Sequence, residues 1–146
     1  MAFGTLETVT VMDIKSQSNS SIMKYSRPHF QYDKATPILA WGHGVSPTDP
    51  DHSSDLLAIS WGKAVILFSL VNIMGGDFDA RSDLTALQGP TETEIEMRQM
   101  KQVGFICSEH FITSVRFLAD SLVAIVVNCN DSNEMRVLST MDFLPD

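Results

Sequence analysis

Hydrophobic residues occupy both faces of one predicted hairpin, LLAISWGKAVILFSL at residues 56–70. Two strand-like segments flank Gly62-Lys63, and glycine suits the first central position of a two-residue type II′ turn because that position needs a positive φ. The turn fixes the register and predicts three cross-strand pairs: Trp61–Ala64, Ile59–Ile66 and Leu57–Phe68. One face then carries Leu57, Ile59, Trp61, Ile66, Phe68 and Leu70. The other face carries Leu56, Ala58, Ser60, Val65, Leu67 and Ser69.

An ordinary antiparallel sheet keeps one polar face toward water, and this hairpin has none. Exposing Leu56, Val65 and Leu67 would forfeit roughly 1.5–3 kcal/mol for each side chain. The total is comparable with the stability of a whole domain, about 5–15 kcal/mol. We therefore expect a further layer of structure on each side of the hairpin, supplied by polypeptide beyond these 146 residues.

Strand signals recur along the rest of the chain. Residues 119–121 predict a three-residue loop that places Phe117 opposite Val123 and Val115 opposite Ile125. One face of this hairpin then carries Val115, Phe117, Val123, Ile125 and Val127, and the reverse face carries Ser114, Arg116, Leu118, Leu122, Ala124 and Val126. A loop over residues 43–54 is predicted, because Pro47 and Pro50 oppose regular structure. A polar insertion is predicted over about 72–93. The remaining predicted strands cover residues 6–14, 22–26, 38–42, 94–107, 112–118, 122–128 and 134–140.

Two stretches repeat one pattern of three antiparallel strands. PILAWG, LLAISWG and AVILFSL correspond in order to ITSVRFL, LVAIVVN and MRVLST. Antiparallel meanders covered on both sides are typical of β-propeller blades; a small sandwich or other closed β fold is the alternative. We predict an all-β chain in which residues 1–146 form an incomplete, WD-repeat-like β-propeller. It would hold about one full blade, from Pro37 to Cys107, and parts of two neighbours, too few to close a ring.

Charge and composition narrow the classes of partner. The net charge is −8, with 10 basic and 18 acidic residues. This balance argues against nucleic acid and against direct adhesion to anionic lipid, since both need Lys and Arg, but it leaves recruitment by another protein open. The N-terminus has no secretory pattern and no apolar run is long enough for a membrane helix. We expect a cytosolic chain with reduced thiols.

Few residue clusters suggest chemistry. His43, Asp49, Asp51 and His52 have ligand-type side chains, but a polar loop is the favoured interpretation. Residues 108–110, Ser-Glu-His, are favoured as a strand-connecting loop, because a hydrolase triad is assembled in space rather than along the chain. There is no phosphate-binding loop and no zinc signature. We predict no catalytic residue, no cofactor and no metal.

Other residues invite an interaction hypothesis. Trp41 and Trp61 could anchor an interface, although packing between blades is favoured. Cys107 is expected to be a buried thiol and Cys129 a turn residue. An acidic segment could meet a basic partner surface, but a solvated loop is favoured. Its acidic residues are Asp77, Asp79, Asp83, Glu92, Glu94 and Glu96.

The segment ATPILAWGHGV, followed by SSDLLAISWGKAVILFSLV, resembles the β-propeller of the vacuolar protein sorting-associated protein 8 family. LETVTVMDIKSQSNSSIMKYSRP before it and FITSVRFLADSLVAIVVNCNDSNEMRVLSTMDF after it are similar to the adjoining strands of that propeller. The resemblance is specific around residues 37–41 and generic elsewhere. The polar segment 74–93 departs from the family pattern.

The resemblance implies a tethering subunit of the CORVET complex, acting in endosome fusion and protein transport to the vacuole or lysosome. Its implied partners are the class C tethering core and an early-endosomal Rab GTPase, and its implied location is cytoplasmic and peripheral on endosomal membranes. No residue here matches a known Rab-contacting motif, so the interaction surface stays unassigned. The alternatives are a self-contained small β module that binds a peptide or small ligand, and a small hydrolase using His110 or His43.

Overall fold

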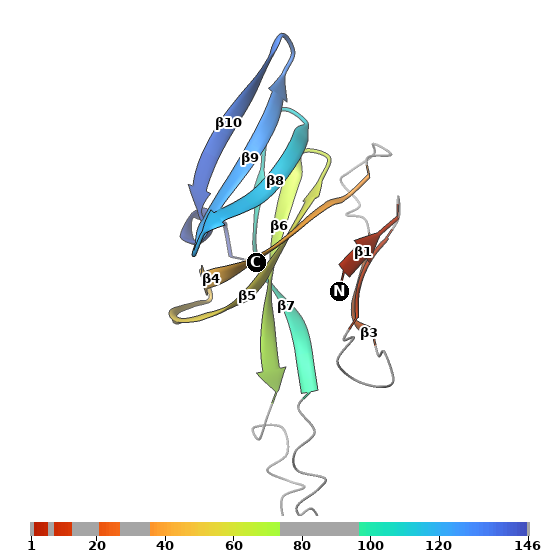
Figure 1. The fold of residues 1–146 in the computed structure, drawn as a ribbon, viewed down its shortest axis with the longest axis vertical. Helices are drawn as coiled ribbons and strands as arrows, with labels where there is room; N and C mark the ends of the chain where they lie inside the picture. Colours follow the sequence, from red (N-terminus) through yellow and green to blue (C-terminus); the bar gives the residue numbers. More distant parts are fainter. Residues whose placement is uncertain (1, 6–7, 13–20, 27–35, 74–96, 146) are drawn as a thin grey trace, which may run out of the picture.

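A computed structural model describes residues 2–5, 8–12, 21–26, 36–73 and 97–145. The described chain is all-β and its sheets are antiparallel, as predicted. Three sheets follow one another along the sequence (Figure 1) and are called here the first, central and third sheets. The first contains β1 (Ala2–Gly4), β2 (Thr8–Met12) and β3 (Ser21–Ser26); the central contains β4 (Ile38–Ser46), β5 (Asp49–Trp61), β6 (Ala64–Ile73) and β7 (Met97–Cys107); the third contains β8 (Ile112–Ala119), β9 (Leu122–Cys129) and β10 (Ser132–Ser139).

The central hairpin has the predicted register. Trp61 pairs with Ala64, Ile59 with Ile66 and Leu57 with Phe68. Gly62 has φ of 65°, and among the described residues only Ser121 and Asn130 are non-glycine positions with positive φ. A positive φ at the first turn position alone is what a type II′ turn requires.

The predicted loop over residues 43–54 is wrong, because β4 and β5 continue through it to a two-residue turn at 47–48. Ser46 pairs with Asp49 while Val45 pairs with Ser53, so three residues of β5 bulge opposite one step of β4. Pro50 lies in this bulge. Its missing N–H removes no ladder hydrogen bond there.

The third sheet covers one face of the central sheet. Leu56, Val65 and Leu67 are fully buried against Val123 and Ile125 of β9. The predicted pairs Phe117–Val123 and Val115–Ile125 are present, with a bulge between Phe117 and Ala119 in place of the three-residue loop. The apolar face assigned to this hairpin from the sequence is therefore the face turned inward.

The first sheet covers the opposite face. Val9 and Val11 of β2 are buried against Leu57, Ile59 and Trp61. Tyr25 of β3 adds an edge-to-face contact with Phe68, with ring centroids 5.1 Å apart, a geometry that aromatic pairs favour.

Both faces of the central sheet are thus covered, as predicted, but the layers come from this chain itself. The expectation that the covering layers lie beyond the 146 residues is wrong for the central sheet. The two-sided apolar pattern correctly indicated two neighbours. The pattern does not indicate which polypeptide supplies the neighbouring layers, because any apolar sheet can bury these side chains.

The segment after β10 returns to the central sheet. A short 3₁₀ helix, Thr140–Asp142, begins with a capping box between Ser139 and Asp142. Phe143 is buried between the central and third sheets. Leu144 then exchanges two backbone hydrogen bonds with Phe105 of β7, of 3.0 and 2.9 Å.

Some boundaries differ from the sequence prediction. β1 was not anticipated, because a three-residue strand carries too little periodicity to detect. β6 continues to Ile73, so the predicted polar insertion begins after 73 rather than at 72. Its remaining residues, 74–93, lie outside the described part of the chain.

Candidate functional site

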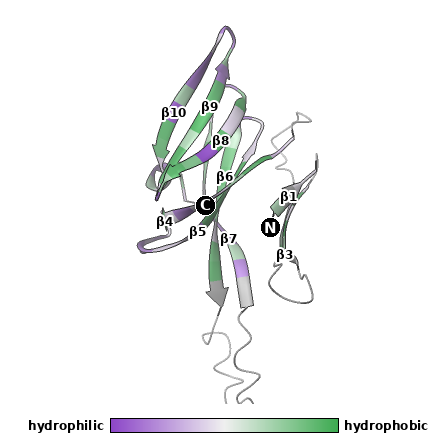
Figure 2. Ribbon diagram, in the orientation of Figure 1, coloured by the Kyte–Doolittle hydropathy of each residue, from purple (hydrophilic) through white to green (hydrophobic). Residues whose placement is uncertain are grey.

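Exposed apolar side chains gather on the outer face of the third sheet, the face turned away from the central sheet. Alternation along the strands places them there, as the register with β9 requires. Met135 is 66% exposed and Leu118 57%. Figure 2 shows the hydrophobic colouring along β9 and part of β10. We name this surface the outer patch; it consists of Leu118, Leu122, Met135 and Val137, with half-buried Val126 between them.

Polar residues border the outer patch. Asn128 pairs with Asn133 near the β9–β10 turn, and Arg116 of β8 lies opposite Ala124. These three polar side chains are on the same face as the patch and all are exposed. A contiguous exposed apolar area with a polar rim is typical of a protein interaction site.

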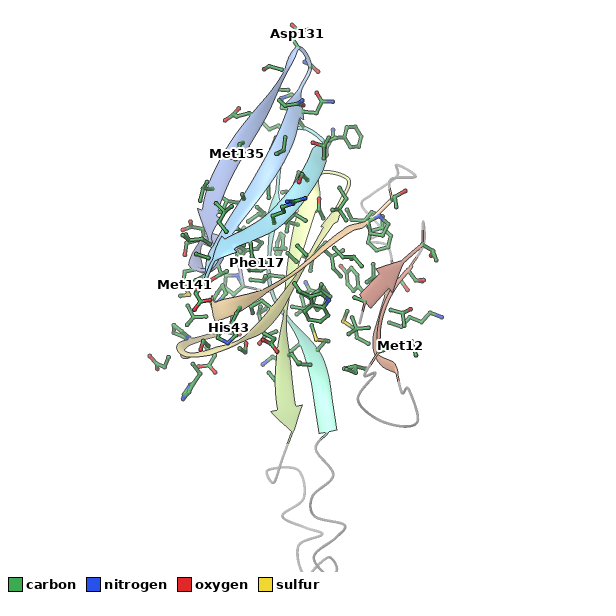
Figure 3. All side chains as sticks on the ribbon, in the orientation of Figure 1. Met12, His43, Phe117, Asp131, Met135 and Met141 are labelled. Atoms are coloured by element: carbon green, nitrogen blue, oxygen red, sulfur yellow. The ribbon has the colours of Figure 1, made fainter. Side chains whose placement is uncertain are left out.

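A groove of about 420 Å³ separates β4 from β8. Its walls are residues 38–41 of β4 and 113–117 of β8. Next to the groove wall formed by Trp41 and Phe117 the strands touch: a Cβ added at Gly42 would lie 2.1 Å from Cγ of Phe117. Figure 3 shows Phe117 in this position between β8 and β4. Gly42 is therefore required by the close approach of the two sheets.

Polar contacts fasten the end of β4 to the third sheet. Val45 N–H donates to Ser121 Oγ at 2.9 Å, and Ser121 N–H donates to His43 O at 3.0 Å. The buried Thr140 hydroxyl donates to Val45 O. Gly44 has φ of 154°, and a Cβ there would lie 2.4 Å from Ser121 Oγ. The contacts satisfy backbone groups at this edge, so they have a structural role.

The residues considered as metal ligands do not converge. His52 Nδ1 lies 3.0 Å from Asp49 Oδ1, but His43 Nδ1 faces Asp120 Oδ1 at 3.8 Å. Asp51 stands exposed in the β5 bulge. In the described part of the chain, no three His, Cys, Asp or Glu residues lie close enough to hold a metal ion.

Residues 108–110 connect β7 to β8, as the favoured interpretation predicted. Ser108 N–H donates to Lys63 O at 2.7 Å and Ile112 N–H donates to Gly62 O at 2.9 Å. Ser108 Oγ accepts a 3.3 Å hydrogen bond from the backbone N–H of His110. These backbone hydrogen bonds hold the connection between β7 and β8 against the turn of the central hairpin.

The tryptophan prediction is half right, and both cysteine predictions differ from the structure. Trp61 is buried between the first and central sheets, whereas Trp41 is 43% exposed beside the groove. The reason is that β4 is an edge strand of the central sheet, and the neighbouring sheets leave its Trp41 side chain partly uncovered. Cys129 is the last residue of β9, one position before the turn, rather than a turn residue, and Cys107 is exposed rather than buried.

The acidic segment, for which a solvated loop is favoured over a partner surface, falls within residues 74–96, outside the described chain. The sequence assignment did not single out the outer patch. Leu118, Leu122, Ala124 and Val126 were placed on the reverse face of their hairpin, which was the available signal. The missing step was that nothing among the described residues covers that face.

One ion pair stands on the inner face of β10. Arg136 Nε donates to Glu134 Oε1 at 3.2 Å. This hydrogen bond, followed by the guanidinium charge, lowers the pKa of Glu134; the same bond raises the pKa of Arg136. Both groups are exposed to solvent, so the pair contributes little to stability.

The structure gives no sign of a membrane-crossing helix in the residues it describes. Comparison of the chain with protein-family models, with characterised proteins and with solved structures found no match.

Proposed function

We propose that the chain is a non-catalytic scaffold, the β-propeller portion of an endosomal vesicle-tethering subunit. In this proposal the three successive sheets are blades: the first partial, the central complete with four strands, and the third with three. The chain would act in endosome fusion and in protein transport to the vacuole or lysosome.

The observation that carries the proposal is the stacking of consecutive meanders. The central sheet is buried on both faces between the sheet before it and the sheet after it. The third sheet repeats the order of the first three central strands and leaves its outer face apolar and exposed. A stack with one open apolar face is what a propeller segment or an interaction scaffold presents.

The proposed partners are proteins. The resemblance of residues 37–41 and their flanks suggests the class C tethering core and an early-endosomal Rab GTPase. The chain would be cytoplasmic and would reach endosomal membranes through these partners, because its net charge of −8 opposes direct contact with anionic lipid. The outer patch is the surface we assign to the protein contact.

Binding of the purified chain to the purified class C core and to the Rab GTPase in each nucleotide state tests the proposal. Leu118→Glu and Leu122→Glu place a charge in the outer patch and should weaken binding at least about tenfold. Asn128→Asp adds the same charge on the polar rim of that face and should leave binding unchanged. The proposed function would be refuted if the chain bound neither the class C core nor the Rab GTPase.

The second candidate is a small β module that binds a peptide or small ligand. The groove between β4 and β8 favours it, since about 420 Å³ lies within the range of small-molecule pockets. Arg116 and the exposed Trp41 would provide a charge and an aromatic surface there. A peptide or fragment that raises the melting temperature of the wild-type chain but not of Trp41→Ala would support this candidate over the scaffold.

A further inference from the structure

The outer edge of β10 has no neighbouring strand among the described residues. β10 is the terminal strand of the third sheet, whose order is β10-β9-β8. The corresponding edge of the central sheet is different, because Leu144 bonds to Phe105 of β7 there. An edge strand with open backbone groups is a template for a further strand.

The hydrogen-bond phase identifies which backbone groups are open. Thr140 N–H donates to Ser121 O across the sheet, whereas Asn128 N–H donates to Phe111 O on the β8 side. In an antiparallel ladder the bonded pairs alternate, so the odd-numbered residues of β10 direct N–H and C=O away from β9. Asp142 accepts the N–H of Ser139. The outward residues that keep an open N–H are Asn133, Met135 and Val137.

The charges on β10 favour pairing with the β10 strand of a second copy of the chain. Glu134 and Arg136 stand on either side of Met135, both on the face opposite the outer patch. When two copies of β10 run antiparallel with Met135 opposite Met135, Glu134 of each copy faces Arg136 of the other. Opposite charges at directly opposed positions stabilise a strand pair, and like charges destabilise it.

Other symmetric registers are less favourable. Centring the pair on Glu134 or on Arg136 places like charges directly opposite one another. Centring it on Asn133 or Val137 leaves both charges without an opposed partner. The register centred on Met135 also pairs nearly the whole strand, from Ser132 to Leu138, and uses all three outward residues.

We propose that β10 is a dimerisation edge: two copies of this chain join their third sheets through antiparallel β10 strands around a two-fold axis at Met135. Each copy offers the same residues to the other, as an isologous contact requires. The third sheets become one continuous sheet, and the two Met135 side chains contact each other on its outer face. This edge is separate from the part of the outer patch that Leu118 and Leu122 form.

Disulfide trapping tests the register in a Cys107→Ser, Cys129→Ser background. Hydrogen-bonded antiparallel partners have Cα atoms about 5.5 Å apart, within disulfide reach. Met135→Cys should therefore give a disulfide-linked dimer on mild oxidation. Val137→Cys is the matched control. It lies on the same face with similar exposure, but its copies are offset by four residues, about 13 Å, and should not cross-link.

Charge exchange tests the pairing by analytical ultracentrifugation, with circular dichroism to verify folding. The wild-type chain should dimerise at micromolar concentration. Glu134→Arg and Arg136→Glu should each weaken dimerisation at least about tenfold, and the double exchange should restore it. A wild-type chain that stays monomeric would overturn the proposal. Binding of an extended peptide, rather than a second copy, to the β10 edge would overturn it in the same way. Equal cross-linking at 135 and 137, or full dimerisation of both single variants, would also overturn it. Loss of binding by Leu118→Glu with dimerisation intact separates this edge from the proposed function.

Discussion

Replacing Gly42 with alanine perturbs the contact between the central and third sheets. The added Cβ would lie 2.1, 2.3 and 2.4 Å from Cγ, Cδ1 and Cδ2 of the Phe117 ring. Carbon atoms prefer separations of about 3.5–4.0 Å, so the ring or the strand must retreat by roughly 1.4 Å. Overpacking of this kind typically costs about 1–3 kcal/mol. We expect Gly42→Ala to lower the free energy of unfolding by that amount.

A double-mutant cycle isolates the cause. Phe117→Ala removes the ring and should cost less than the roughly 3–5 kcal/mol of a fully buried phenylalanine, since Phe117 is half-buried. In that background Gly42→Ala should be neutral, or stabilising by up to about 0.5–1 kcal/mol, because glycine loses more conformational entropy on folding than alanine does. The expected coupling between the two positions is therefore about 1–3 kcal/mol.

Urea denaturation followed by tryptophan fluorescence, to which buried Trp61 and partly exposed Trp41 both contribute, measures all four free energies. The slope of free energy against urea should stay constant, which shows that the variants unfold through the same transition. The reasoning is refuted when Gly42→Ala costs the same with and without the Phe117 ring. In that case the two sheets do not meet through this pair.

The remaining predictions concern the faces of the sheets and their polar contacts. Leu57→Ala and Leu67→Ala should each cost about 2–5 kcal/mol in urea denaturation, because opposite faces of the central sheet are both buried, while Leu118→Ala should change stability by less than about 0.5 kcal/mol. Thr140→Val should cost about 1–3 kcal/mol in the same assay, since it leaves a backbone carbonyl of β4 without its donor. The stability of Glu134→Gln should equal that of wild type in acid and fall slightly below it at neutral pH. The lowered pKa of Glu134 adds stability above the ordinary carboxyl range, and this contribution is lost as the pH falls through the folded-state pKa. A pH series of thermal melts measures the difference.

The register of both hairpins could be predicted from the sequence. In the central hairpin two local signals agree, whereas in the hairpin of the third sheet the alternation alone was right, because a bulge replaces the predicted three-residue loop. Alternation assigned the faces, and Gly62 supplied the turn that its φ of 65° requires. The pairs Ile59–Ile66 and Val115–Ile125 follow directly. Such information lies within a few residues of each position, so it needs no knowledge of the tertiary structure.

Features that depend on distant residues were not predictable. Pro50 was read as a strand breaker, but the bulge opposite Val45 accommodates it. Trp41 was expected between layers, although its edge strand leaves it beside the groove. Exposure of the outer patch follows from how far each covering layer extends. No local pattern encodes that extent, because a buried and an exposed apolar face alternate in the same way.

The return of Phe143 and Leu144 to β7 has a consequence for synthesis on the ribosome. These residues are translated last among the described segments, yet they fill the space beside Gly104 and Val103 of a strand made much earlier. Until they emerge, β7 lacks part of its cover, and such a nascent chain exposes apolar surface that chaperones recognise. Complete cover of β7 therefore waits for translation of this segment, and an elongation arrest before residue 143 would lengthen the period in which that apolar surface is exposed.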